Sequence, residues 1–588
     1  MVRGVALAGV LVVAVLAMAA PSASAHAQLE GVTPQRGAVV RTSPAAVAFR
    51  FDEAVEGNFG AVRVFDSAGT RVDAGDAYHP GGHGEQIAVH LPSSLRPGTY
   101  TATYRVVSAD GHIVSGGSTF SVGRPGAAGA TVADLLAGSN TGPVTAVALG
   151  VGKGVAFAAI ALAVGGLAFL LWSWPAAAAA APGAAGRGRP RPADTLDSAA
   201  GAAFGRRLRV LLVASALAGA VGSAAVVVLE GAQAAGISGW SALDPDIVGE
   251  TLGTKVGAIW GVAAAVWLAV AGLSMVALAV RRRTGSTAVA VALGAALTYL
   301  VLVPGLGGHA STQHPVGLML PANAIHVAAM ALWTGGLVTL LAAVPAATRQ
   351  VAPEGRTRML AAGLARFSPL ALAAVVVLTA AGIAQAIVEV RTPAHLLDTA
   401  FGRAVLIKAL LLVALIAIGA WHRRSSIPRL RAIAVAGGSP AQTGVVVRRA
   451  LRAEVALLAV VLGVTAALST YAPSIATTAG PFETTTTIGP AQMQVVVDPA
   501  TVGANEIHLY LLNPRDGRQW NRAKEVEISA AQADRGIGPL REQVNRAGPG
   551  HYVVTGAPLA VPGDWTLRIT VRVSDFDQYE RRLEVPIR

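Results

Sequence analysis

The sequence predicts a multi-domain chain: an all-β sandwich or barrel, a polytopic bundle of about eight transmembrane helices, and a second, small β-sandwich. Its composition is too apolar for a soluble protein of 588 residues, with 53% hydrophobic and 13% charged residues and a mean hydropathy of +0.55. Long uncharged runs occupy only the middle of the chain. Short alternating runs of apolar and polar residues, separated by turn residues, fill both flanks.

Residues 1–25 have the pattern of a secretory signal peptide. Arg3 supplies a positive charge, residues 5–20 form an apolar run, and Ala23-Ser24-Ala25 is an A-x-A cleavage site. Cleavage after Ala25 makes His26 the mature amino terminus.

Residues 26–123 predict the first β module. Strands are expected at 47–51, 61–65, 87–91, 100–107 and 119–122, because turn residues such as Pro92, Gly98 and Gly116 separate these runs. Residues 124–143 are rich in Gly and Ala and are expected to be a linker.

Residues 144–473 predict the membrane part. Most of its apolar runs can cross a hydrocarbon core of about 30 Å at roughly 1.5 Å per residue. Eight helices are expected, at 144–172, 208–230, 256–280, 287–304, 321–344, 367–389, 403–421 and 452–473.

Arginines predict the orientation of these helices. They cluster after the first, third, fifth and seventh helix, beginning at Arg187, Arg281, Arg349 and Arg423. By the positive-inside rule these loops are cytoplasmic, so both soluble modules lie outside the cytoplasm and the chain is a multi-pass plasma-membrane protein. The same loops account for much of the net charge of +13, and without a recognised motif or a basic aromatic face the sequence excludes nucleic acid as a partner.

Residues 482–588 predict an extracytoplasmic β-sandwich. Trp565, Leu567 and Ile569 alternate with polar residues, and so do Ile507 and Leu509.

The absence of cysteine excludes disulfides, zinc ribbons and thiolate metal sites. The sequence also has no Walker motif and no G-x-S-x-G, so no catalytic residues are predicted and the chain is not expected to be an enzyme.

A metal site is predicted from His26, Asp110 and His112. A terminal histidine offers its α-amine and its imidazole to one metal, and Asp110-Gly111-His112 adds a carboxylate and a second imidazole. Such nitrogen and oxygen donors suit divalent copper. The alternative is an ordinary Asp-Gly turn beside a surface histidine. Glu53 is a candidate for orienting a ligating imidazole, or equally an exposed strand residue.

A second set of candidates lies in and before the fifth helix. An imidazole at membrane depth is a functional candidate, and Met330 lies one helical turn after His326. With His309, His314 and Met319 just before them, these residues could form a membrane path for copper. The alternative is that His326 hydrogen-bonds a neighbouring helix and Met330 only packs.

Several motifs resemble known copper proteins. Residues 26–123 resemble the CopC family in their mature start His26-Ala27-Gln28-Leu29, in residues 51–56 (Phe-Asp-Glu-Ala-Val-Glu) and in residues 108–112 (Ser-Ala-Asp-Gly-His). The membrane part resembles CopD in His326 followed by Trp333-Thr334-Gly335-Gly336, in Arg366-Phe367-Ser368-Pro369, and in Phe401-Gly402-Arg403 leading to Lys408. Residues 482–588 are similar to small YtkA/FixH-like domains.

The resemblance implies a copper-resistance or copper-uptake protein with Cu(II) bound at the N-terminal module. Some CopC proteins carry a second, methionine-rich site for monovalent copper. Residues 26–123 contain no methionine, so one divalent and no monovalent copper site is expected there.

The expected function is copper capture outside the cytoplasm followed by transport through the membrane helices. Copper ions and the lipid bilayer are the expected partners, with an extracytoplasmic copper chaperone or an oxidase-assembly factor as a further candidate. The alternatives are copper buffering or delivery without transport, and a membrane metalloreductase.

Overall fold

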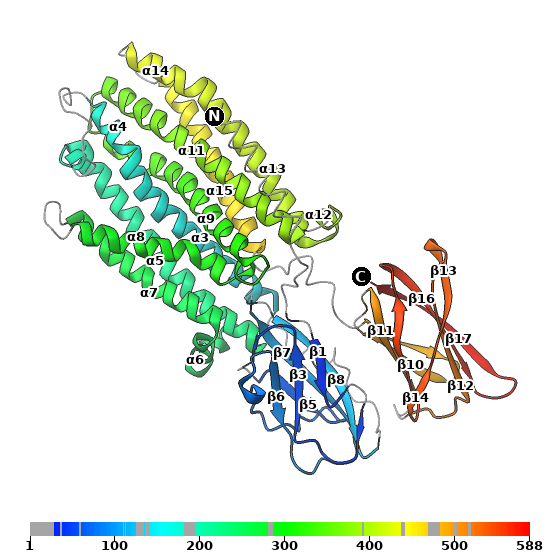
Figure 1. Cartoon of the computed structure of the whole chain (residues 1–588). Coiled ribbons are helices and arrows are strands. Elements are labelled where there is room, and N and C mark those ends of the chain that lie inside the picture. Colours follow the sequence, from blue (N-terminus) through cyan, green and yellow to red (C-terminus); the bar gives the residue numbers. More distant parts are fainter. Residues whose placement is uncertain are drawn as a thin grey trace. The chain divides into compact units, whose positions relative to one another are not determined.

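The computed structural model describes residues 27, 29–35, 38–57, 60–109, 111, 113–124, 135, 142–181, 194–279, 286–390, 393–436, 441–468, 482–498, 500, 502–514 and 519–587. The chain divides into two compact units. One holds the membrane-type helices and the other holds the strands of both β modules (Figure 1). The predicted fold class of β module, helical bundle and second β module is confirmed. The predicted signal peptide lies outside the described residues, as does most of the predicted linker.

The first β module contains two sheets, with strand orders β1-β3-β6 and β2-β8-β7-β4; β5 pairs with β7. The strands are β1 (Leu29–Thr33), β2 (Val39–Val40), β3 (Ala46–Phe51), β4 (Val55–Glu56), β5 (Val62–Phe65), β6 (Gln86–His90), β7 (Gly98–Ser108) and β8 (Ile113–Val122). All five predicted strands are present. Sequence reasoning missed β1, β2 and β4, because two of these strands have only two residues.

Aromatic side chains join the two sheets of this module. Phe49 and Phe51 on β3 are buried, and their rings lie 4.9 and 5.2 Å from that of Tyr104 on β7. Gly116 lies opposite Tyr104 in the β7–β8 hairpin. A Cβ there would lie 2.6 Å from the phenol oxygen, so only glycine leaves room for the tyrosine.

Eight helices in the described part of the chain are long and apolar enough to span a membrane, as predicted. They are α3 (Gly142–Trp172), α5 (Ala199–Ala235), α7 (Lys255–Ala279), α8 (Ser286–Leu306), α9 (Val316–Ala342), α11 (Pro353–Val390), α13 (Ala400–Trp421) and α15 (Ala441–Leu468). The shorter helices α4 (Trp174–Ala179), α6 (Pro245–Gly253), α10 (Val344–Thr348), α12 (His395–Asp398) and α14 (Ile427–Val435) lie between them.

Several predicted helix boundaries were wrong. Helices α5, α11 and α15 begin at Ala199, Pro353 and Ala441, which is 9, 14 and 11 residues before the predicted starts at 208, 367 and 452. Arginine is a good helix former, so the helices continue through the Arg-containing stretches that hydropathy assigns to loops.

Helices α3 and α9 cross at two glycines. A Cβ on Gly335 would lie 1.8 Å from the carbonyl oxygen of Ala161, and one on Gly165 would lie 2.4 Å from that of Ala331. Backbone therefore meets backbone at this crossing, as in other small-residue contacts between membrane helices.

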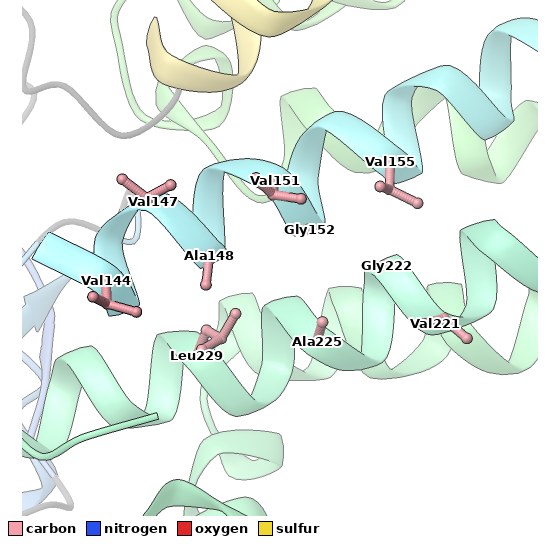
Figure 2. A pocket seen from close by; sticks show the side chains of 10 residues that line it. All are labelled: Val144, Val147, Ala148, Val151, Gly152, Val155, Val221, Gly222, Ala225 and Leu229. Atoms are coloured by element: carbon pink, nitrogen blue, oxygen red, sulfur yellow. The ribbon is translucent and has the colours of Figure 1, made fainter. Parts of the chain in front are cut away.

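An apolar groove of about 700 Å³ runs between α3 and α5. Figure 2 shows Val144, Val147 and Val151 on α3 along one side and Val221 and Leu229 on α5 along the other. Its lining of Val, Ala, Gly and Leu side chains offers no metal donor. The same two helices are joined by an ion pair of 2.9 Å between Lys153 Nζ and Glu230 Oε1.

The second β module also has two sheets, β14-β15-β11-β10-β9 and β13-β12-β16-β17. Its strands are β9 (Phe482–Ile488), β10 (Ala491–Asp498), β11 (Gly503–Leu512), β12 (Glu525–Gln532), β13 (Ile537–Glu542), β14 (Asn545–Gly548), β15 (His551–Leu559), β16 (Gly563–Arg572) and β17 (Gln578–Ile587). Ile507 and Leu509 from the first sheet and Trp565, Leu567 and Ile569 from the second are fully buried in one core. The predicted alternation is confirmed.

Candidate metal centres

Strand pairing brings three segments of the first β module together. β1 pairs with β3 so that Leu29 lies opposite Phe51, which places the beginning of β1 near the loop that holds Glu53. That loop leads into β4, where Val55 pairs with Ser108 at the end of β7. The beginning of β1, the β3–β4 loop and the β7–β8 turn therefore converge.

Hydrogen bonds link these segments through Ser108. The backbone N–H of Ala27 donates to Ser108 Oγ over 3.4 Å, and the same hydroxyl donates to the carboxylate of Glu53. Ala27 and Ser108 are both buried, with 3% and 1% of their surface exposed. Such a shared buried hydroxyl holds the two chain segments in one arrangement.

The predicted ligands His26, Asp110 and His112 lie outside the described residues. Their immediate chain neighbours do not: Ala27 follows His26, and Gly111 separates Asp110 from His112. The N–H of Gly111 donates to the carbonyl of Ser108 over 2.8 Å, and its φ of +87° requires glycine. Among the described residues no three His, Cys, Asp or Glu side chains form a metal-binding group.

Glu53 is not the exposed strand residue that was one of the two alternatives. It lies in a bend, is half-buried, and its carboxylate accepts from Ser108. Its role toward a ligating imidazole stays a prediction, but the hydrogen bond places its carboxylate beside the buried turn.

His326 lies in α9 and its ring faces α11. Its Nδ1 is 3.1 Å from the carbonyl oxygen of Leu378, and a Cβ on Gly382 would lie 3.2 Å from its Cε1. The predicted alternative, a hydrogen bond to a neighbouring helix, is therefore present. It uses one ring nitrogen only.

This hydrogen bond determines the tautomer of His326. A carbonyl oxygen can only accept, so Nδ1 carries the proton, and in the neutral ring Nε2 is then left with its lone pair. A backbone carbonyl in this position commonly orients a histidine that binds metal. His326 thus combines a fixed ring with a nitrogen able to act as a ligand.

Further polar residues extend this region of α9 and α11, and sequence reasoning missed two of them, Asn323 and Gln385. Asn323, one turn before His326, donates through Nδ2 to Gln385 Oε1 over 3.2 Å. Lys408 on α13 lies within electrostatic range of both His326 and Glu389. Amide side chains inside apolar runs were the available signal for Asn323 and Gln385.

The other predicted path residues have different surroundings. Met319 is fully buried in α9, and Met330 packs against the helical core. His309 begins a short 3₁₀ helix and His314 precedes α9, so both belong to the connection from α8. A copper path through these residues stays a prediction.

Comparison with known families gives three matches along the chain. The CopC domain matches residues 29–123, the copper resistance protein D-like N-terminal domain matches residues 144–317, and copper resistance protein D matches residues 361–468. These matches end before residues 482–588, whose resemblance to YtkA/FixH-like domains stays a prediction.

Individual relatives agree with these matches. The chain is 28% identical over 566 residues to the copper transport protein CutJ of Bacillus subtilis (strain 168), across 94% of each protein. It is 35% identical over 112 residues to protein YobA of Escherichia coli (strain K12), across 19% of this chain and 90% of that protein.

Two solved structures are similar to the first β module. CopC from Methylosinus trichosporium OB3b is 31% identical, across 17% of this chain and 95% of that one, with a TM-score of 0.16. PcoC, a methionine-rich copper resistance protein from Escherichia coli, is 25% identical, across 16% of this chain and 98% of that one, with a TM-score of 0.15.

Proposed function

Because this chain belongs to the copper resistance and transport proteins that join a CopC domain to a CopD membrane domain, we propose that it captures divalent copper outside the cytoplasm and moves copper through its membrane helices. The observation that supports the proposed capture of copper is the chain of hydrogen bonds that links Ala27, Ser108 and Glu53. It ties the residue after His26 to the turn that bears Asp110 and His112.

Capture rests on a mature amino terminus at His26. Its α-amine and imidazole, with the imidazole of His112 and the carboxylate of Asp110, form a nitrogen-rich set suited to the tetragonal preference of Cu(II). Ser108 supports this set indirectly, because its hydroxyl positions the backbone of Ala27.

Movement of copper rests on His326. Its Nδ1 is engaged by Leu378 and its Nε2 is left as a donor within the helical bundle. Lys408 lies within electrostatic range of both His326 and Glu389, so a basic and an acidic side chain accompany the imidazole in this part of the bundle. The membrane potential supplies about 2.3 kcal/mol per charge per 100 mV to a cation moving inward.

Capture is tested by Ser108→Ala in the full chain, with Ser115→Ala as the control. Ser115 is exposed on the same hairpin. Loss of a group that orients metal ligands lowers affinity by roughly 10–100-fold, so Cu(II) affinity should fall by at least about tenfold for Ser108→Ala only. One extra residue before His26 should lower it further by removing the amine ligand. Unchanged affinity in both would refute the proposed site.

Transport is tested by His326→Ala. The variant should retain Cu(II) binding by the first β module but change the copper content of cells relative to the parent chain. Equal copper content, with equal amounts of protein in the membrane, would leave a binding protein without transport.

A further inference from the structure

The second β module contains two histidines, His508 and His551, and the fold brings them into contact. β11 and β15 pair antiparallel, with Tyr510 opposite His551 and His508 opposite Val553. The two histidines are therefore diagonal neighbours on one face of the sheet, although 43 positions separate them in sequence.

This face is not the one that forms the module's core. His508 alternates along β11 with Ile507 and Leu509, whose side chains are fully buried in the core. Both imidazoles are nevertheless buried, with 3% exposed for His508 and 6% for His551. Two buried imidazoles outside the hydrophobic core are not explained by packing between the two sheets.

The rings are aligned end to end. Nδ1 of His508 lies 3.2 Å from Nε2 of His551, the centroids are 5.5 Å apart, and the ring planes differ by 19°. The centroid distance exceeds the nitrogen distance by about two ring radii, so the two nitrogens lie near the line that joins the rings. Without metal, one N–H donates to the other nitrogen along this line.

Two neighbours hold the rings in this orientation. Glu506 Oε2 lies 3.5 Å from Nε2 of His508, which favours the proton on that nitrogen and leaves Nδ1 bare. Tyr510 stacks on His551 with centroids 4.3 Å apart and planes 11° apart. Glu506 faces the nitrogen remote from His551, so its position suits an orienting group and not a ligand between the rings.

We propose that His508 and His551 form a second copper site, specific for the monovalent ion, with copper held linearly between Nδ1 of His508 and Nε2 of His551. Two opposed imidazole nitrogens match the linear coordination that monovalent copper accepts, whereas divalent copper prefers a tetragonal set. With metal–nitrogen bonds of about 2 Å, the two nitrogens must separate from 3.2 Å to roughly 4 Å. The proton on Nε2 of His551 moves to Nδ1 of the same ring, so both ligands stay neutral.

This site does not depend on the capture or transport proposed above. The expected sites of those steps are in residues 26–123 and in the membrane helices, whereas this pair is in residues 482–588. With this site, the first β module would bind Cu(II) and the second β module would bind Cu(I).

The test is a titration of the full chain in detergent with Cu(I) under anaerobic, reducing conditions, in competition with a chromophoric Cu(I) chelator. His551→Gln can still hydrogen-bond His508 but lacks an imidazole, and should lose one tightly bound equivalent. His551→Met supplies a soft thioether in its place and should retain that equivalent. His83→Gln, which removes an exposed imidazole from a loop, is the control and should bind as the parent chain does.

Full Cu(I) binding by His551→Gln would overturn the proposal. So would equal loss in the Gln and Met variants when both melt below the parent chain, because the loss would then follow from a damaged fold and the pair would be structural. Cu(II) binding, measured on the same samples, shows separately whether the first β module binds copper. Absence of Cu(II) binding would refute the proposed capture but would not affect the proposed Cu(I) site.

Discussion

Replacing Gly335 by alanine should destabilise the helical bundle more than most substitutions that add a single methyl group. The added Cβ would lie 1.8 Å from the carbonyl oxygen of Ala161 on α3, and real Cβ atoms do not approach closer than 3.0 Å. The two backbones must therefore separate by at least about 1.2 Å, which loosens neighbouring contacts along both helices. Overpacking of this kind typically lowers stability by about 1–3 kcal/mol. Because the Cβ would clash with backbone, which cannot move aside as a side chain can, we expect Gly335→Ala to cost about 3 kcal/mol.

The matched control is Gly317→Ala in the same helix. A Cβ on Gly317 meets nothing within 4 Å, so the exchange should be neutral or should stabilise the helix by up to about 1 kcal/mol. Thermal unfolding of the purified chain in detergent, followed by tryptophan fluorescence, compares the two variants. If Gly335→Ala unfolds at the same temperature as Gly317→Ala, the glycine crossing does not hold α3 and α9 together.

Three further outcomes are expected. Gly382→Val should displace the ring of His326 from the carbonyl of α11, because a Cβ at this position would already lie 3.2 Å from the ring, and cellular copper content should change while Cu(II) capture is retained. In the otherwise cysteine-free chain, a cysteine at Thr485 should react with an impermeant maleimide on intact cells, and one at Gly437 only after permeabilisation; the reverse pattern contradicts the topology. Burial, with a smaller contribution from His508, lowers the pKa of His551 to about 4. The metal-free module should therefore lose about 3 kcal/mol of stability as the pH falls from about 6.5 to 4, since the unfolded ring binds its proton first. Pulse proteolysis in urea should show this dependence in the parent chain and not in His551→Gln.

The pattern of apolar and polar residues was sufficient to predict a strand or a helix where that pattern is regular over the whole segment. The alternation of Trp565, Leu567 and Ile569 predicted a core face, and the uncharged runs predicted the eight spans. Helix ends were less predictable, because an apolar run marks only the part of a helix that lies in lipid. The polar turns that continue the helix into water are not apolar and were therefore assigned to loops. The start of α11 at Pro353 is an example.

The candidate sites were predictable only where a single residue is conspicuous. His326 stands out in an apolar run, but its partner is the carbonyl of Leu378, which no side-chain pattern reveals. The alternation along β11 predicts its core residues, yet it gives no sign that His508 meets His551, because that contact depends on the register between β11 and β15. Ser108 likewise gains its role from pairing between distant strands.

The ion pair between Lys153 and Glu230 bears on how the chain enters the membrane. A lone lysine or acidic residue at the centre of a membrane helix raises the free energy of insertion by roughly 2.5–3.5 kcal/mol, which is an upper bound for Lys153 and Glu230 because each lies nearer to a helix end. Lys153 lies on the first membrane helix to leave the ribosome and Glu230 on the second, and the two charges are 2.9 Å apart. Helices α3 and α5 are therefore expected to enter the bilayer as a hairpin, in which the second helix neutralises the charge that the first cannot easily carry into lipid alone.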